Sequence, residues 1–364
     1  MTPSLSLVRS LRWAVPAVAV ALVAGAAVLP AALASSGPAD LAPRSAAQLL
    51  VDLAGARPTA LSGTVVQTSR LGLPELPGSG GTTGPGSLAT GSHTLRVWAD
   101  GPDRQRVALL GSLAEYDVVR SGRDVWTYSS GKDEAVHYVL PVHRAEPPPV
   151  GTELPSTPAA AAQAALAALD PTTSVDVEPA VTVAGRSARQ LLLTPKTPGT
   201  LVGSVRLAVD AETSAPLRVQ VFSAADRAVP ALEVGFTDVR FDRPDASVFA
   251  FSPPPGTTVT QKAAPRQAAP RSTPQGPAHD TSPDRPTDTG AGTGPTVVGT
   301  GWSSILVAPG IDAAAADQAA LLDQLTTRVP QGRLLTTALV SVLLTDDGRL
   351  LVGAVTPEIL RAAA

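Results

Sequence analysis

The side chains that could perform catalysis or bind a metal are few and poorly spaced for either role. The four histidines are His93, His137, His143 and His279, and they form neither an HExxH motif nor a His-x-His pair, so we expect no protein-ligated transition metal. The sequence has no cysteine, which excludes thiolate ligands and a cysteine nucleophile. Neither a Gly-x-Ser-x-Gly elbow nor a Gly-x-x-x-x-Gly-Lys phosphate loop is present.

Acidic pairs are the remaining candidates for acid or base catalysis. Asp133-Glu134 and Asp346-Asp347 both fall where the sequence predicts hairpin turns, and turn chemistry explains them more simply than proton transfer does. We therefore predict no catalytic residues, no metal site, no cofactor and a protein that is not an enzyme. The net charge of -3 gives no basic excess for a phosphate backbone, so nucleic acid is not an expected partner.

Most of the chain consists of short alternating strands separated by turn signals, which predicts antiparallel sheet structure. Two stretches, Pro43–Leu53 and Thr157–Leu169, have helical composition or spacing instead. Helices before and between groups of strands indicate an α+β fold. The expected strands are Leu61–Thr68, His93–Ala99, Arg104–Leu110, Tyr116–Arg120, Asp124–Tyr128, Val136–Leu140, Ser174–Val183, Ala188–Leu193, Ser204–Val209, Leu217–Phe222 and Leu232–Phe241.

Apolar residues alternate along these strands, and they suit a curved sheet with one face turned toward a cavity or a covering helix. Plain core packing uses the same residue types and stays the competing interpretation. Strand alternation alone selects the following lipid-cavity candidates: Leu95, Val97, Val107, Leu109, Val118, Val125, Leu191, Leu193, Val205, Leu207, Val219 and Val221.

The N-terminus carries a membrane or export signal. Residues 13–34 contain no charged side chain and follow Arg9 and Arg12, which predicts a cytoplasmic stretch over residues 1–12 and the rest of the chain outside. About 22 residues at roughly 1.5 Å each can cross a hydrocarbon core of ~30 Å. Ala32-Leu33-Ala34 also fits a signal-peptidase site. The segment is therefore a single-pass anchor or a signal peptide cleaved after Ala34.

A change in composition separates two folded units. We assign residues 43–260 to the main domain and residues 261–295, which are rich in Pro, Thr, Ala and Gly, to a disordered linker. Residues 296–364 then form a small C-terminal βαββα unit. Its expected elements are a strand over Val297–Ala308, a helix over Asp312–Val329, and strands over Leu334–Leu344 and Leu350–Val355 that flank an Asp-Gly turn.

Several motifs of the main domain resemble those of a known superfamily. Leu207–Val221 reads as strand, turn and strand, Val234–Phe241 continues the pattern, and Phe249-Ala250-Phe251-Ser252-Pro253-Pro254 closes it. Together with Trp98–Val107 and Gly122–Tyr128, these segments resemble the lipoprotein-carrier superfamily that includes LolA, LolB and the N-terminal domain of RseB/MucB. The resemblance spans roughly residues 43–260.

This resemblance implies an unclosed antiparallel half-barrel with a helical lid around an apolar cavity for acyl chains. The implied function is that of a cell-envelope protein that handles or senses a lipid or an acylated lipoprotein. An RseB-like regulator, whose partner is an anti-sigma factor or another envelope protein, is the alternative. The chain lacks a lipobox cysteine, so it is not expected to be a lipoprotein as LolB is.

Overall fold

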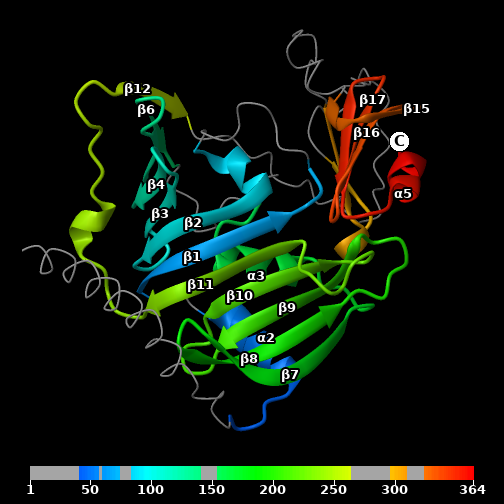
Figure 1. The fold of residues 1–364 in the computed structure, drawn as a ribbon, viewed down its shortest axis with the longest axis horizontal. Helices are drawn as coiled ribbons and strands as arrows, with labels where there is room; N and C mark the ends of the chain where they lie inside the picture. The colour runs from blue at the N-terminus through cyan, green and yellow to red at the C-terminus, as the bar shows by residue number, and fades with distance from the viewer. Residues whose placement is uncertain (1–40, 57–59, 74–82, 141–153, 264–295, 310–323) are drawn as a thin grey trace, which may run out of the picture.

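The structure, a computed structural model, describes residues 41–56, 60–73, 83–140, 154–263, 296–309 and 324–364 (Figure 1). The predicted signal or anchor segment over residues 13–34 and most of the predicted linker lie outside these residues. Within the described ranges, no helix is long and apolar enough to cross a membrane.

The main domain is built on one twelve-stranded sheet in the order β12-β6-β5-β4-β3-β2-β1-β11-β10-β9-β8-β7. All neighbouring strands are antiparallel except β12 and β6. Strands β12 and β7 are its two free edges, so the sheet does not close, and the predicted unclosed half-barrel is confirmed. The strands are β1 (Leu61–Arg70), β2 (Thr90–Ala99), β3 (Arg104–Leu110), β4 (Glu115–Ser121), β5 (Asp124–Ser129), β6 (Glu134–Val139), β7 (Ser174–Val183), β8 (Arg186–Thr194), β9 (Val202–Asp210), β10 (Pro216–Ser223), β11 (Leu232–Arg240) and β12 (Thr258–Ala263).

Two helices cover one face of this sheet, as predicted. Helix α2 (Ala46–Gly55) starts at a capping box in which Ser45 and Gln48 exchange side-chain and backbone hydrogen bonds. Helix α3 (Pro158–Ala167) is capped by Thr157, whose Oγ1 accepts from the Ala160 N–H at 3.2 Å. Their inward residues, such as Leu49 and Ala162, share one hydrophobic core with strands β7 to β11, and Figure 1 shows both helices behind these strands.

The C-terminal unit differs from the predicted βαββα arrangement. Its described residues form a six-stranded sheet in the order β13-β14-β18-β17-β16-β15, with a short helix after β18. Its elements are β13 (Thr296–Val298), the 3₁₀ turn η4 (Gly301–Ser303), β14 (Ile305–Pro309), β15 (Thr327–Val329), β16 (Gly332–Thr336), β17 (Ser341–Thr345), β18 (Arg349–Gly353) and α5 (Pro357–Ala362).

Two of the expected strands in this unit, Val297–Ala308 and Leu334–Leu344, are wrong, because each is a pair of antiparallel strands joined by a turn. The strand expected over Leu334–Leu344 is a hairpin, because Thr337 Oγ1 accepts from the backbone N–H groups of Leu339 and Val340 and turns the chain. Most of the helix predicted over Asp312–Val329 lies outside the described residues, and only its last three residues are contradicted, because Thr327–Val329 pairs with β16 as strand β15. The hairpin predicted at the Asp-Gly turn is confirmed by the pairing of β17 with β18.

The segment after β11 lies over the outer face of the sheet, opposite α2 and α3. The 3₁₀ turn η3 (Ala246–Phe249) buries Phe249 against β3 and β4. The chain then adds β12 beside β6 in parallel. Gln261–Ala263, the first residues that we assigned to the linker, therefore belong to the sheet, because their backbone groups pair with His137–Val139.

The C-terminal unit packs directly on the main domain (Figure 1). The backbone N–H of Leu201 donates to the Ala354 carbonyl at 2.8 Å, and the Thr356 N–H donates to the Gly199 carbonyl at 2.8 Å. Trp302 and Leu339 of the unit are buried within the core of the main domain. The C-terminal unit thus contributes to the core of the main domain and also has a core of its own, which includes Leu343 and Leu351.

Candidate functional site

All the lipid-cavity candidates lie on one face of the twelve-stranded sheet. Directly opposed residues of antiparallel strands share a face, and Val107 pairs with both Val97 and Val118. In the other half of the sheet, Leu207 pairs with both Leu191 and Val219. Strand β1 joins the two halves, and the face that carries these candidates is called the candidate face below.

Burial divides the candidate face into two regions. Most candidates are fully buried beneath the helices and the C-terminal unit, where they act as core residues. These are Leu95, Val97, Leu109, Leu191, Leu193, Val205, Leu207 and Val219. The half-buried candidates are Val107, Val118, Val125 and Val221.

The region over β3 to β6 is the more open part of the candidate face. Val118 and Val125 lie there, and the strand register adds three half-buried side chains that sequence reasoning missed: Tyr116, Val136 and Tyr138. Residues two positions apart on one strand share a face of the sheet, and so do residues directly opposed on neighbouring strands. This rule, applied to the candidates already selected, could have found these three side chains. Contact of this region with a lipid stays a prediction.

A buried polar group interrupts the candidate face at its centre. Gln67 is fully buried on β1, and its Nε2 donates to the Leu88 carbonyl at 3.1 Å and to Ser69 Oγ at 3.2 Å. No described donor reaches its Oε1. An unpaired buried acceptor costs about 1–3 kcal/mol. Sequence reasoning missed this residue, although Val65, Gln67 and Ser69 alternate along one strand and place a glutamine at an inward position.

A hollow of about 590 Å³ lies elsewhere, beside helix α2. Its lining includes Arg44, Gln48 and Val51, and Val51 is one of the most exposed apolar residues of the described chain. The hollow is on the outer side of α2, whereas Leu49 and Leu53 point into the core. It therefore does not belong to the candidate face.

The described histidines have structural contacts. His137 stacks on Trp126 with ring centroids 4.3 Å apart, and its Nε2 lies 2.8 Å from Asp124 Oδ1. The Nε2 of His93 lies 2.7 Å from the Thr90 carbonyl oxygen. His143 and His279 are outside the described residues. Across the described part of the chain, no group of three His, Asp or Glu side chains could hold a metal.

The outer aromatic cluster formed by Trp126, Tyr128, His137 and Phe251 attaches the segment after β11 to the sheet. Phe251 lies 5.5 Å from the Trp126 ring and 5.7 Å from the Tyr128 ring. We expect Phe251→Ala to lower the free energy of unfolding by about 1–2 kcal/mol through lost ring contacts, with a change in tryptophan fluorescence. Exposed Val259→Ala is the control and should change stability by less than about 0.5 kcal/mol. Equal effects from the two substitutions would contradict this account.

The acidic pairs lie at turns, as the sequence analysis expected. Asp133 adopts φ +50° at the β5–β6 turn. Asp347 accepts from Arg349 Nε at 2.8 Å at the β17–β18 turn. Hydrogen bonds from Thr345 and Arg349 hold the pKa of Asp347 below its ordinary value. These contacts are those of turn residues.

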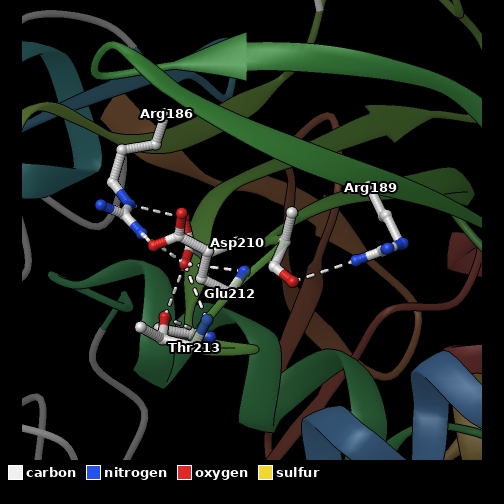
Figure 2. A network of polar contacts seen from close by, with 7 residues as sticks. Arg186, Arg189, Asp210, Glu212 and Thr213 are labelled. Atoms are coloured by element: carbon white, nitrogen blue, oxygen red, sulfur yellow. Dashed lines mark hydrogen bonds and ion pairs between the residues drawn. The ribbon is translucent and has the colours of Figure 1, made fainter. Parts of the chain in front are cut away.

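A network of polar contacts lies at the end of β9 (Figure 2). Arg186 donates from Nε to Asp210 Oδ1 at 2.6 Å and from one terminal nitrogen to Oδ2 at 2.9 Å. The backbone N–H and the hydroxyl of Thr213 also donate to Asp210 Oδ2, at 2.9 and 2.8 Å. Burial opposes ionisation of Asp210, but the bonds from Arg186 and Thr213 outweigh it and lower its pKa.

This network stabilises the turn between β9 and β10. The side chain of Asp210 is 1% exposed, whereas that of Glu212, which also pairs with Arg186, is 81% exposed. Arg189, drawn beside the network, donates instead to the backbone carbonyl of Ala211 at 3.1 Å. Because Arg186, Asp210 and Thr213 satisfy one another, we interpret the network as a structural brace.

Comparison with known proteins gives similarity of fold. No family model matches the chain, and no curated protein matches it significantly. The MucA/MucB complex from Pseudomonas aeruginosa matches at 18% identity, covering 87% of this chain and 96% of that chain with a TM-score of 0.43. A LolA-superfamily protein from Nitrosomonas europaea matches at 12% identity, covering 57% and 99% with a TM-score of 0.22. The Mycobacterium tuberculosis lipoprotein LppX matches at 8% identity, covering 54% and 96% with a TM-score of 0.26. Solved structures of the superfamily that the sequence resembles are thus among those to which this chain is similar.

Proposed function

We propose that the chain binds a lipid or a lipoprotein acyl group on the candidate face, in the region over β3 to β6. One observation carries this proposal: the apolar residues of the candidate face pass from buried Leu95 and Leu109 to half-buried Val118, Val125 and Tyr138, with Arg120 and Thr127 among them. Half-buried apolar groups adjoining a packed core offer an acyl chain a surface that becomes more buried on binding. The proposed role is binding, and we include in the proposal that the chain is not an enzyme.

Burial of methylene groups would drive this binding. Each buried CH₂ contributes about 0.8 kcal/mol, so a chain of about 16 carbons could contribute roughly 10 kcal/mol before ordering costs. Side chains in the fully buried part of the face are already covered by other residues of the protein. The half-buried region is therefore the proposed point of contact.

Native mass spectrometry of the full chain, extracted from its producing cell in a mild detergent, tests the proposal. A stoichiometric acyl lipid on the protein supports it and identifies the ligand. A clean apo mass that takes up no added palmitoyl lipid contradicts it and favours a protein-binding regulator.

A pair of valine substitutions locates the binding surface. Val118→Asp places a carboxylate on the candidate face, and we expect it to reduce palmitate uptake about tenfold or more, because an ionised group is costly to desolvate. Val259→Asp is the matched control, because the strand register places Val259 with Ala135 on the outer face. Equal uptake by the two variants would place the acyl site elsewhere.

A regulator that binds another envelope protein is the second candidate function. Strand β13 is a free edge of the C-terminal sheet, and its Val297 and Val298 are 65% and 52% exposed. Exposed edges of this kind can accept an extended segment of a partner as an added strand. Val297→Pro removes a backbone donor from β13, so a pull-down that loses the partner with this variant, while lipid uptake persists, would support the regulator.

The proposed location is outside the cytoplasm. The uncharged segment over residues 13–34 and the preceding Arg9 and Arg12 support export. The chain would then remain attached as a single-pass protein or be released after Ala34. Edman sequencing of the protein isolated from its cell distinguishes these two outcomes.

A further inference from the structure

The fully buried amide of Gln67 lies on the candidate face near the middle of the twelve-stranded sheet. On this face its strand neighbours are His93 of β2 and Val234 of β11, which oppose it directly. Val65, two residues earlier on β1, is also fully buried. The amide thus stands in the interior of the protein, with both polar and apolar neighbours.

The hydrogen bonds of this amide fix its orientation. Both hydrogens of Nε2 are engaged, by the Leu88 carbonyl and by Ser69 Oγ, and Ser69 Oγ donates in turn to the same carbonyl at 2.6 Å. Exchange of the amide oxygen and nitrogen would set the oxygen against the Leu88 carbonyl, two acceptors without a proton between them. The oxygen therefore lies on the other edge of the amide.

Gln67 Oε1 is an acceptor without a donor among the described residues. The Nε2 of His93 is directed to the Thr90 carbonyl. A buried acceptor without a partner is rare in proteins and calls for a specific explanation. An apolar residue at this position would avoid the penalty.

We propose that Gln67 Oε1 receives a hydrogen bond from the ligand, and that the ligand is an acyl compound with an amide N–H or a hydroxyl close to its chain. This inference rests on the proposed acyl-binding function and narrows its ligand class. The acyl chain lies along the β3 to β6 region, and its donor reaches β1. Esters without a nearby donor bind less tightly, because their oxygens are hydrogen-bond acceptors and Gln67 Oε1 is an acceptor too.

Two probes that differ in one hydrogen-bond donor test the inference: N-butylpalmitamide, which has an amide N–H, and N-butyl-N-methylpalmitamide, which has none. Their dissociation constants are measured on the full chain by calorimetry in one detergent, so that detergent competition affects both alike. We expect the N–H probe to bind about fivefold more tightly, as one net hydrogen bond allows.

Gln67→Met distinguishes the effect of the hydrogen bond from the steric effect of the extra methyl group on the second probe. Methionine keeps the length of the side chain without the acceptor, and we expect the preference to fall to about unity. Thr68→Val changes the neighbouring residue, whose hydroxyl bonds to Ser92. This variant should retain the preference for the N–H probe. The same preference in wild type and Gln67→Met, or none in wild type, overturns the inference and leaves a buried water as the partner of Oε1. Binding of neither probe to wild type overturns the proposed acyl-binding function, and this inference with it.

Discussion

Asp210→Ala should lower the free energy of unfolding by about 3 kcal/mol, because it removes the buried partner of Arg186 and of both Thr213 donors. The remaining bond from Arg186 to Glu212 lies at the surface and cannot replace it. Urea denaturation followed by circular dichroism measures the change.

Two control variants separate the buried carboxylate from the exposed one. Glu212→Ala should cost less than about 1 kcal/mol, since that side chain is 81% exposed. Asp210→Asn keeps the shape and can still accept from Thr213, so we expect an intermediate loss. Equal losses for Asp210→Ala and Glu212→Ala would show that the buried brace contributes nothing beyond a surface ion pair.

The same carboxylate makes stability depend on pH. The pKa of Asp210 is lower in the folded protein than in the unfolded chain, where it is about 3.9. Its contribution is therefore complete above that unfolded value and is lost as the pH falls through it toward the folded pKa. Wild type should lose more stability than Asp210→Asn between about pH 5 and pH 3, and parallel pH profiles would contradict this.

Trp302→Ala should detach the C-terminal unit from the main domain. The indole is 7% exposed, and its Nε1 donates to Thr173 Oγ1 at 2.9 Å. Thr173 Oγ1 donates in turn to Asp170 at 3.0 Å. Loss of a buried tryptophan costs about 3–5 kcal/mol. Hydrogen exchange should therefore speed up at the backbone amides of Leu201 and Thr356, which bond across the contact.

Trp302→Phe is the matched control because it retains an aromatic ring, while it removes the hydrogen bond and the smaller ring of the indole. We expect it to cost about 1 kcal/mol and to leave exchange at Leu201 and Thr356 slow. Unchanged exchange in Trp302→Ala would mean that the backbone bonds between Gly199–Leu201 and Ala354–Thr356 hold the two units together without the indole. Point substitutions suit this question better than removal of residues 296–364, which would uncover the core beside Leu339.

The local sequence determined most of the strands and both lid helices. Period-two alternation shows which residues of one strand share a face, and Leu95 with Val97 or Leu191 with Leu193 followed this rule. The Asp-Gly turn and the capping residue Thr157 are also local signals, because their chemistry acts within a few residues. The resemblance in Leu207–Val221 and Phe249–Pro254 predicted the open half-barrel.

Only the tertiary structure decided what the candidate face contains. Whether the face of one strand continues on the next depends on register, which joined Val107 to Val118 and placed Gln67 between His93 and Val234. The lid helices, Trp302 and Leu339 filled one part of the face and left the β3 to β6 region half-buried. The β12 strand and the docked C-terminal unit were likewise invisible to local patterns, because their pairing joins residues more than a hundred positions apart. Alternation therefore identified the apolar residues, while packing between distant segments decided which are core and which can meet a ligand.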